Sequence, residues 1–320
     1  MWFFLSCTAT KMMDSGDTEM ISPKIYEYDD LLRITDGMVL GTHNSYHLQP
    51  EATTVGEWNY SHPSLSIQLD QGVRQFELDV QKDPTTGELM VLHVPVLDPK
   101  SNCPLLQDCL DEILAWSTEH PQHFPLQVLI EPKDEIANWS ISAQLEDWAL
   151  LDQMLLNTFG DKLITPDTIQ DEYPSLREAV LDKGWPTLAT SRGKIIVALL
   201  DTGIGRSTYT ADLTSLENRI LFPLVDEDHE FAAYFLKDDP FDSDIANLAR
   251  QGFLIRTRGD AGLIFDENRV QTALESGANA ISTDLMESRY WMDPSTPVQC
   301  AAYNRFVGQN SEICIPSYLE

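Results

Sequence analysis

Short apolar runs that each end near a chemically active side chain are the feature that most constrains the fold. Met38–Leu40 is followed closely by His43, Met90–Leu92 is followed by His93, and a third run ends at Glu131. Runs of this length, bounded by turn residues, are typical of buried strands. Parallel α/β barrels place their functional side chains at the carboxyl ends of such strands. The pattern therefore predicts the α/β class and, within it, a parallel (β/α)8 barrel, or TIM barrel.

Amphipathic segments alternate with these runs, as β/α units require. Strands are predicted at 38–41, 75–80, 88–93, 124–130, 194–200, 219–225, 253–256 and 278–282. Helices are predicted at 65–71, 104–116, 145–159, 175–181, 245–251 and 267–275. The strands at 75–80 and 88–93 flank a turn and should form a hairpin, whereas 201–215 is rich in glycine, serine and threonine and should be a long loop. Seven strand–helix units are clear, and an eighth is expected.

Length and continuity favour a single domain. One α/β barrel needs about 250 residues, and the 320-residue chain contains no linker and no internal repeat. We assign 25–320 to the barrel, with a C-terminal tail over roughly its last thirty residues, 290–320. Residues 1–24 are leader-like and are expected to be disordered or processed. Within them, Cys7 would be the modified residue if the segment is a lipoprotein leader.

The charge balance restricts the partners of the protein. Lys and Arg number 21 against 51 Asp and Glu, which gives a formal net charge of −30. Binding to a phosphate backbone needs a basic surface, so nucleic acid is not expected as a partner. An enzyme this acidic would need basic groups or a metal ion at its site to act on an anionic lipid. We expect a monomer that contacts a membrane surface only transiently.

Cysteine spacing predicts two local disulfides. Cys103 and Cys109 form one closely spaced pair, Cys300 and Cys314 form a second, and Cys7 is left alone. Such pairs are typical of secreted proteins, whereas cytosolic proteins keep their cysteines reduced. We therefore expect a secreted, periplasmic or cell-surface protein. The alternative is a cytosolic enzyme with five free thiols.

Oxygen ligands converge in the first 131 residues. Glu77 and Asp79 lie two apart on one predicted strand, so they point to the same face. Asn44 and Glu131 each follow an apolar run and should reach the same end of the barrel. An amide and three carboxylates are hard oxygen ligands, which suit Ca²⁺ and, less well, Mg²⁺. Taken one at a time, these residues could equally form a solvated sheet face and a loop.

Two histidines frame the same predicted site. His43 and His93 follow different strands, and histidine is the side chain best suited to move protons near neutral pH. A hard divalent ion beside two histidines is the combination that phosphodiester cleavage needs, because the ion neutralises the phosphate while the histidines serve its oxygens. Each histidine alone could instead be a hydrogen-bonded structural residue.

Four basic residues of this acidic chain are candidates for contacts with a phosphate group. Lys133 and Arg256 are the stronger candidates, because each sits at the end of an apolar run. Lys194 and Arg258 are weaker. Lys194 begins its strand, so it could equally be a solvated lysine at the far end of the barrel.

Several motifs together resemble a known family. The N-terminal motifs are Gly41-Thr-His-Asn-Ser-Tyr46, Gly72-Val-Arg-Gln-Phe-Glu-Leu-Asp79, His93 and Glu131. The later motifs are Leu254-Ile-Arg-Thr-Arg-Gly-Asp260 and Ser276-Gly-Ala-Asn-Ala-Ile-Ser-Thr-Asp284. They resemble phosphatidylinositol-specific phospholipase C, most closely the secreted, calcium-dependent type of bacteria and fungi. The resemblance extends from about residue 36 to residue 285.

The resemblance implies a distorted TIM (β/α)8 barrel that cleaves phosphatidylinositol to diacylglycerol and inositol 1,2-cyclic phosphate by attack of the inositol 2-hydroxyl. The four basic candidates would then contact the phosphate or the inositol ring. Ca²⁺ would be held by the four oxygen-bearing residues, Asn44, Glu77, Asp79 and Glu131. His43 would contact the phosphoryl oxygens, and His93 would protonate the departing diacylglycerol oxygen. The acceptor of the 2-hydroxyl proton stays open. Animal relatives carry lysines where this chain has the apolar Ile195–Leu200, which favours an unphosphorylated inositol head group.

Other functions remain open at the level of sequence. Glycerophosphodiester phosphodiesterases and phospholipase D-like enzymes of the same barrel superfamily keep two histidines and a Glu-x-Asp pair, but the His43-Asn44 motif favours the calcium type. A glycosidase could use Glu77 and Glu131 as its carboxylate pair, but it would leave both histidines without a role. A catalytically silent barrel that binds calcium or another ligand is the non-enzymatic alternative.

Overall fold

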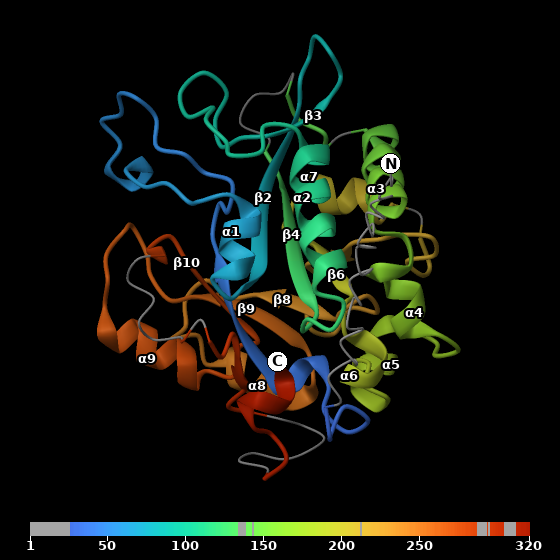
Figure 1. The fold of residues 1–320 in the computed structure, drawn as a ribbon. Coiled ribbons are helices and arrows are strands. Elements are labelled where there is room, and N and C mark those ends of the chain that lie inside the picture. Colours follow the sequence, from blue (N-terminus) through green and yellow to red (C-terminus); the bar gives the residue numbers. More distant parts are fainter. Residues whose placement is uncertain are drawn as a thin grey trace, which may run out of the picture.

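The protein is a curled parallel sheet with helices on its outer side (Figure 1). The computed structural model describes residues 26–133, 139–142, 144–211, 213–286, 293, 295–303 and 312–320. The predicted leader 1–24, with Cys7, lies outside the described residues. The α/β class and the distorted barrel are confirmed, and the sheet topology shows where the distortion lies.

Eight parallel strands form the barrel among the described residues. In order around it they are β1 Gly37–Thr42, β2 Val73–Lys82, β4 Leu126–Pro132, β6 Ile195–Leu199, β7 Phe222–Pro223, β8 Tyr234–Leu236, β9 Leu254–Arg258 and β10 Ala280–Thr283. Strand β10 pairs with β1 and closes one side. Within the described part of the chain, no ladder joins β7 to β8, so the barrel is open at that seam.

Three further strands extend the sheet. β3 Leu89–Val91 pairs antiparallel with β2 and forms the predicted hairpin. β5 Leu163–Ile164 lies beside the start of β6, and β11 Val298–Cys300 pairs antiparallel with β1. Both predicted disulfides, Cys103–Cys109 and Cys300–Cys314, are present.

The helices cover the outside of the barrel. They are α1 Leu65–Asp70, α2 Leu106–Glu119, α3 Leu145–Phe159, α4 Pro166–Gln170, α5 Leu176–Asp182, α6 Leu188–Ser191, α7 Ile204–Tyr209, α8 Asp244–Gln251, α9 Glu267–Glu275 and α10 Pro316–Leu319. Single 3₁₀ turns occur at Ile34–Asp36, Gly56–Trp58 and Gly160–Lys162. In the described ranges, no helix is both long enough and apolar enough to span a membrane.

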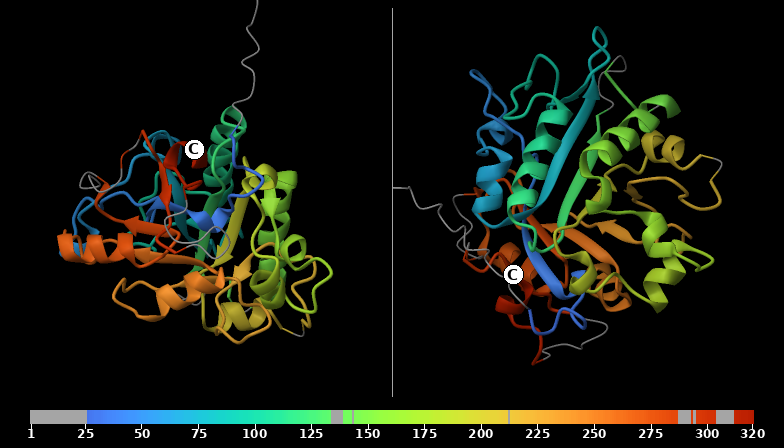
Figure 2. Two further views of the ribbon diagram at one scale, coloured as in Figure 1. Left: turned by 90° about the horizontal axis from the view of Figure 1, so that it is seen from below. Right: turned by 45° about the vertical axis from the view of Figure 1, so that its right-hand side comes forward.

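The alternation of side chains along β2 determines which residues face the site. Phe76, Leu78 and Val80 pack outward in one apolar cluster with residues of α2 and α3, which cover β2 and β4 on the outside (Figure 2). Because successive residues of a strand point to opposite faces, Glu77 and Asp79 are directed into the barrel. The apolar cluster therefore fixes the direction of both carboxylates.

The end of the barrel opposite the site is closed by the C-terminal segment. Glu320 accepts hydrogen bonds from Nε of Arg74 at 3.0 Å and from the backbone N–H of Phe124 at 2.8 Å. Arg74 is buried and stacks on Trp116, and Leu319 is fully buried. These contacts stabilise the amino ends of β2 and β4. Both strands are therefore fixed at the end opposite Glu77, Asp79 and Glu131.

Some predicted elements differ from the structure. The predicted loop 201–215 contains helix α7, whose Tyr209 is buried and donates its hydroxyl proton to Asp152 at 2.8 Å. Only two residues of α7 are buried, so it leaves almost no periodic signal. The predicted strand 219–225 shrinks to Phe222–Pro223, since proline cannot donate to a ladder. Strand β8 was not predicted, because three residues are too few to show alternation.

The turn before β6 allows a test of the fold. Gly193 has φ +70°, and a Cβ there would overlap the carbonyl oxygen of Pro121. Gly87 has a similar φ of +76°, but the nearest atom to its added Cβ is Cε of Lys82 at 4.0 Å. Gly87→Ala should cost about 1 kcal/mol for the left-handed backbone alone. Gly193→Ala should cost about 3 kcal/mol, because it adds a steric overlap with backbone.

Urea denaturation of both variants measures the difference in the free energy of unfolding. Equal losses in Gly193→Ala and Gly87→Ala would show that the backbone of 121 and 193 is not in close contact. The two free energies of unfolding can be compared directly if both variants keep the same m-value, the slope of that free energy against urea concentration.

Candidate active site

A cavity of about 540 Å³ opens at the carboxyl ends of the barrel strands. Most of the residues singled out in the sequence line it: His43, Asn44, Glu77, His93, Glu131, Lys133, Arg256 and Arg258. Asp79 is fully buried beside them and contacts Lys133. Lys194 is the exception. It lies at the amino end of β6, where its ammonium donates to the backbone carbonyl of Asp161, and it does not join the cavity.

The turn after β1 is held tightly against β2. The backbone N–H of Ser45 donates to the carbonyl oxygen of Glu77 at 2.9 Å, and the Ser45 hydroxyl accepts from the N–H of Glu77 at 2.8 Å. Asn44 has φ +43°, a left-handed conformation that asparagine tolerates better than most residues. Its side-chain Oδ1 is buried and accepts no hydrogen bond among the described residues. The fold thus presents an unused amide oxygen at the cavity.

Three carboxylates gather next to this amide. Asp79 and Glu131 are direct neighbours in the β2–β4 ladder, and Glu77 lies two residues before Asp79. One oxygen from each of Glu77, Asp79 and Glu131 lies within 4.8 Å of the others. Calcium binds oxygen at about 2.4 Å, so ligand oxygens around one ion lie up to about 5 Å apart. The three carboxylates are therefore spaced to fit a hard cation of that size.

Basic side chains only partly balance these carboxylates. Nζ of Lys133 lies 3.0 Å from Asp79 and 2.8 Å from Glu131, and Arg256 donates to Glu77 at 2.5 Å and also pairs with Asp238. Burial acts to lower the pKa of Lys133, but its two carboxylate partners outweigh this and raise it. Burial nevertheless raises the pKa of Asp79 well above its usual value. A further cation would favour the ionised form of all three carboxylates.

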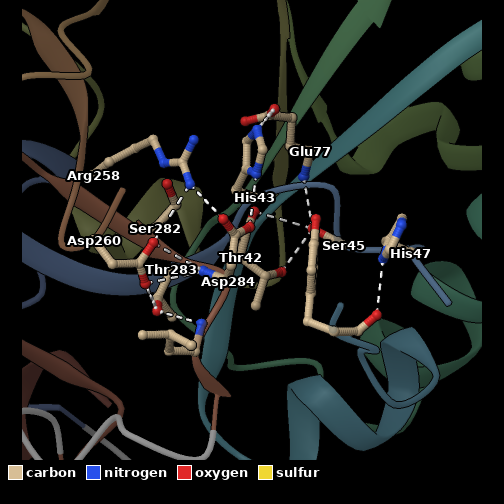
Figure 3. A network of polar contacts seen from close by, with 12 residues as sticks. Thr42, His43, Ser45, His47, Glu77, Arg258, Asp260, Ser282, Thr283 and Asp284 are labelled. Carbon is tan, nitrogen blue, oxygen red and sulfur yellow. Dashed lines mark hydrogen bonds and ion pairs between the residues drawn. The ribbon is translucent and has the colours of Figure 1, made fainter. Parts of the chain in front are cut away.

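His43 is fixed between two acidic side chains (Figure 3). Its Nδ1 lies 2.7 Å from Asp284 and its Nε2 lies 3.4 Å from Glu77. Burial lowers the pKa of His43, but the charges of Glu77 and Asp284 prevail, so the pKa is raised. Arg258 donates to the other oxygen of Asp284 at 2.5 Å. The ring is therefore oriented, and its protonated form is stabilised.

Asp284 is in turn positioned by Asp260. Its backbone N–H donates to Asp260 at 3.1 Å, and the hydroxyl of Thr283 donates to the same carboxylate. Although burial acts in the opposite direction, His43 and Arg258 hold the pKa of Asp284 far below its usual value. On the other side, Nε2 of the buried His62 donates to the carbonyl oxygen of His43 at 3.0 Å.

His93 is held by an aspartate that follows it closely. Its Nδ1 lies 2.9 Å from Oδ2 of Asp98, and the same carboxylate contacts Nε2 of His47 at 2.9 Å. Asp98 and His47 are fully buried, whereas the side chain of His93 is 22% exposed to the cavity. Burial acts to raise the pKa of Asp98, but hydrogen bonds from the two histidines lower it overall.

Sequence reasoning named no role for three of these residues. Asp284 is separated from the apolar residues of its strand by Ser282 and Thr283, but its place just after the predicted strand 278–282 could have identified it. Asp98 and His47 carry no such signal. Asp98 lies within a turn, and only the folded loop brings it back beside His93 and His47.

The sequence matches one known protein family along most of its length. The family model described as "Phosphoinositide phospholipase C, Ca2+-dependent" matches residues 32–90 and 88–304. A search of curated protein sequences finds no match.

Solved structures of similar fold include two calcium-dependent bacterial enzymes. The phosphatidylinositol-specific phospholipase C of Streptomyces antibioticus is 20% identical with a TM-score of 0.62, covering 80% of this chain and 96% of that chain. The phosphoinositol-specific phospholipase C of a Pseudomonas species is 20% identical with a TM-score of 0.58, covering 82% and 93%. A myo-inositol complex of the Pseudomonas enzyme is also similar, with 20% identity, a TM-score of 0.58, and coverage of 81% and 93%.

The structural likeness establishes the fold, and the family match extends over most of the chain. The chain belongs to the family of Ca²⁺-dependent phosphoinositide phospholipases C and is an enzyme of that family.

Proposed function

We propose that the protein cleaves phosphatidylinositol, in the presence of calcium, to diacylglycerol and inositol 1,2-cyclic phosphate. The observation that carries this proposal is the charge of the cavity. Six acidic residues line it against three basic ones, and all three basic residues are already paired with carboxylates. A phosphodiester anion would be repelled from such a cavity unless a cation entered with it.

Glu77, Asp79, Glu131 and the free Oδ1 of Asn44 are the groups that would hold the ion. When bound, calcium supplies positive charge that offsets the phosphate and lowers the pKa of the inositol 2-hydroxyl. Calcium is favoured over magnesium because it accepts irregular sets of carboxylate and amide oxygens, whereas magnesium demands near-ideal octahedral geometry.

His43 is suited to the phosphoryl group. Asp284 and Glu77 stabilise its protonated form, and a protonated imidazole donates strong, charge-assisted hydrogen bonds to phosphate oxygens. Its fixed ring orientation means that little reorganisation is needed as negative charge develops in the transition state.

His93 is suited to the leaving group. As the bond from the inositol 2-oxygen to phosphorus forms, the bond from phosphorus to the diacylglycerol oxygen breaks, and that oxygen must gain a proton. His93 would give this proton from Nε2, because its Nδ1 is engaged by Asp98. The 2-hydroxyl proton must pass to a base, and the carboxylates of Glu77 and Glu131 line the same cavity.

The inositol ring would contact the basic side chains of the cavity. Lys133, Arg256 and Arg258 line it, and each could donate to an inositol hydroxyl or a phosphate oxygen as well as to the carboxylate that it already bonds. The structural relative crystallised with myo-inositol supports a head group of this type. The two disulfides support a location outside the cytoplasm, where oxidising conditions preserve them.

Apolar side chains at the cavity mouth would contact the lipid surface. Val96 is 88% exposed and Leu97 is 64% exposed, in the turn that follows the cavity residue His93. Ile264, 68% exposed, lies two residues after Gly262, which also lines the cavity. Because the chain carries a net charge of −30, apolar contact rather than charge must hold the mouth against a membrane.

Calcium dependence is the first test of the proposal. Phosphorus NMR of the products from phosphatidylinositol should show a cyclic inositol phosphate that disappears when a chelator is added. Glu131→Gln removes one charge from the ion site and should reduce activity about 100-fold. Glu88→Gln, on the exposed β2–β3 turn, is the matched control and should retain full activity.

Persistence of turnover in chelator would reject the calcium role. Release of choline or glycerol from other phosphodiesters, without turnover of phosphatidylinositol, would instead indicate one of the other enzymes of the superfamily.

Replacement of His43 distinguishes an enzyme from a binding protein. His43→Asn removes the charged donor and should lower kcat about 100- to 10,000-fold, while vesicle binding stays unchanged because the apolar mouth is intact. Vesicle sedimentation and product release are measured on the same preparation. Full activity of the variant would contradict the role given to His43.

The lipid-contact role of the apolar cavity mouth is tested by replacing two of its exposed side chains. Val96→Ser with Leu97→Ser should weaken binding to phosphatidylcholine vesicles at least about tenfold, since even partial burial of two such side chains is worth about 1.5 kcal/mol. Hydrolysis of water-soluble inositol cyclic phosphate should not change. Leu156→Ser, at a 47% exposed position on α3, is the control and should bind vesicles normally. Equal losses on soluble and vesicle substrates would contradict a lipid-contact role.

A further inference from the structure

Asp98 is the meeting point of two histidines from different parts of the chain. Its Oδ2 lies 2.9 Å from Nδ1 of His93 and 2.9 Å from Nε2 of His47, and its Oδ1 lies 3.1 Å from the same His47 nitrogen. The carboxylate is fully buried. Both rings are therefore anchored to a single charged group that has no exposure to water.

The loop that carries Asp98 is shaped to return it beside His93. Asp98 and Val94 exchange two backbone hydrogen bonds, of 2.8 and 3.1 Å, which close the loop on itself. At its tip, Val96 has φ +71°, a conformation that β-branched residues rarely adopt. Such backbone strain costs about 1–3 kcal/mol and persists only where surrounding contacts impose it. The contacts of Asp98 with the two histidines are of that kind.

His47 has no nitrogen available for substrate. Its Nδ1 lies 3.1 Å from the carbonyl oxygen of Tyr60, and its Nε2 faces Asp98. The ring also stacks on Tyr60, with centroids 4.3 Å apart and an interplanar angle of 23°. Because both nitrogens are engaged and the ring is buried, His47 acts on the site only through Asp98.

His93 differs from His47 in this respect. Its Nδ1 is held by Asp98, while its Nε2 forms no hydrogen bond within the described part of the chain. Trp58 meets the ring edge to face, with centroids 5.6 Å apart, and restricts its rotation. The ring is thus fixed with one nitrogen bound and the other directed to the cavity that it lines.

We propose that Asp98 is the positioning residue of His93, and that His47 fixes Asp98, so that the three residues act as one unit. This inference rests on the proposed function, because it assigns the orientation of the group that protonates the leaving oxygen. A carboxylate can accept from both rings at once, whereas an amide offers one acceptor and one donor. Asp98→Asn must therefore break the contact with one ring or force that ring into its other tautomer.

The test compares two leaving groups. Diacylglycerol needs a proton as it departs, whereas a nitrophenolate ion does not. Asp98→Asn should lower kcat about 100-fold on phosphatidylinositol, but less than about fivefold on the nitrophenyl ester of inositol phosphate, where acid catalysis contributes little. Equal losses on both substrates would overturn the proposal, because a purely structural defect does not depend on the leaving group.

A matched control is available on α3. Asp152 is also buried and also serves several donors, among them the Tyr209 hydroxyl at 2.8 Å and Arg219 at 3.1 Å. Asp152→Asn should reduce thermal stability while leaving kcat on both substrates unchanged. A selective loss in Asp152→Asn equal to that in Asp98→Asn would also overturn the proposal.

His47 is tested by conservative rescue. His47→Leu should lower kcat on phosphatidylinositol about tenfold, because Asp98 loses one of its two partners. His47→Gln places an amide N–H near the position of Nε2 and should restore kcat to within about threefold of the native protein. No difference between the leucine and glutamine variants would refute the supporting role of His47.

Nitrogen NMR of the histidine rings provides a measurement that needs no turnover. In the native protein, Nδ1 of His93 should carry a proton that exchanges slowly with water, and Asp98→Asn should abolish this signal or shift it. An unchanged ring spectrum in Asp98→Asn would reject the inference. If the native protein cleaves neither substrate, the proposed function fails, and the ring spectrum still decides whether Asp98 orients His93.

Discussion

The crowding of carboxylates inside the barrel mouth is the constraint on which the site depends. Glu77, Asp79 and Glu131 are brought together by the β2–β4 ladder, where the pairing register leaves them no other position. Like charges this close in a poorly hydrated environment repel strongly. Lys133 and Arg256 offset the repulsion, and the apolar packing outside β2 prevents the strand from turning its acidic face away. The free energy of apolar packing thus offsets the repulsion among the three carboxylates. Unfavourable local electrostatics of this kind are common in active sites.

The two histidines of the cavity, His43 and His93, are oriented in the same way but have different neighbours. Each has one ring nitrogen bound to an aspartate, Asp284 for His43 and Asp98 for His93. His43 has a second carboxylate near its other nitrogen, whereas His93 has an aromatic neighbour, Trp58, against its ring. The second carboxylate favours the charged form of His43, and in the proposed reaction His93 is the ring that gives up a proton. The difference arises from their surroundings alone.

Sequence patterns predicted much of this fold, and the reason is physical. Long helices such as α3 and α9 and buried strands such as β6 have periodic apolar residues, and their predicted positions agree closely with the structure. The clustering of Glu77, Asp79 and Glu131 was predictable because strand ends in a parallel barrel converge. Short elements such as β8 and contacts made by turns, such as that of Asp98, depend on tertiary packing that no local pattern records. Lys194 was predicted wrongly. A lysine suits contact with a phosphate, but Lys194 lies at the amino end of β6, the end of the barrel away from the cavity.

The seam between β7 and β8 has a consequence for how the molecule can move. In a closed barrel, strands cannot separate without breaking a ladder of hydrogen bonds, so the diameter of the ring is fixed. Here no ladder links Pro223 to Tyr234 among the described residues, and the seam lies beside cavity residues Leu224 and Leu236. On that side, the described strands therefore lack the ladder that fixes the diameter of a closed barrel. Among the described residues, separating β7 from β8 breaks no ladder, whereas separating β2 from β4, the strands that carry the carboxylates, breaks one.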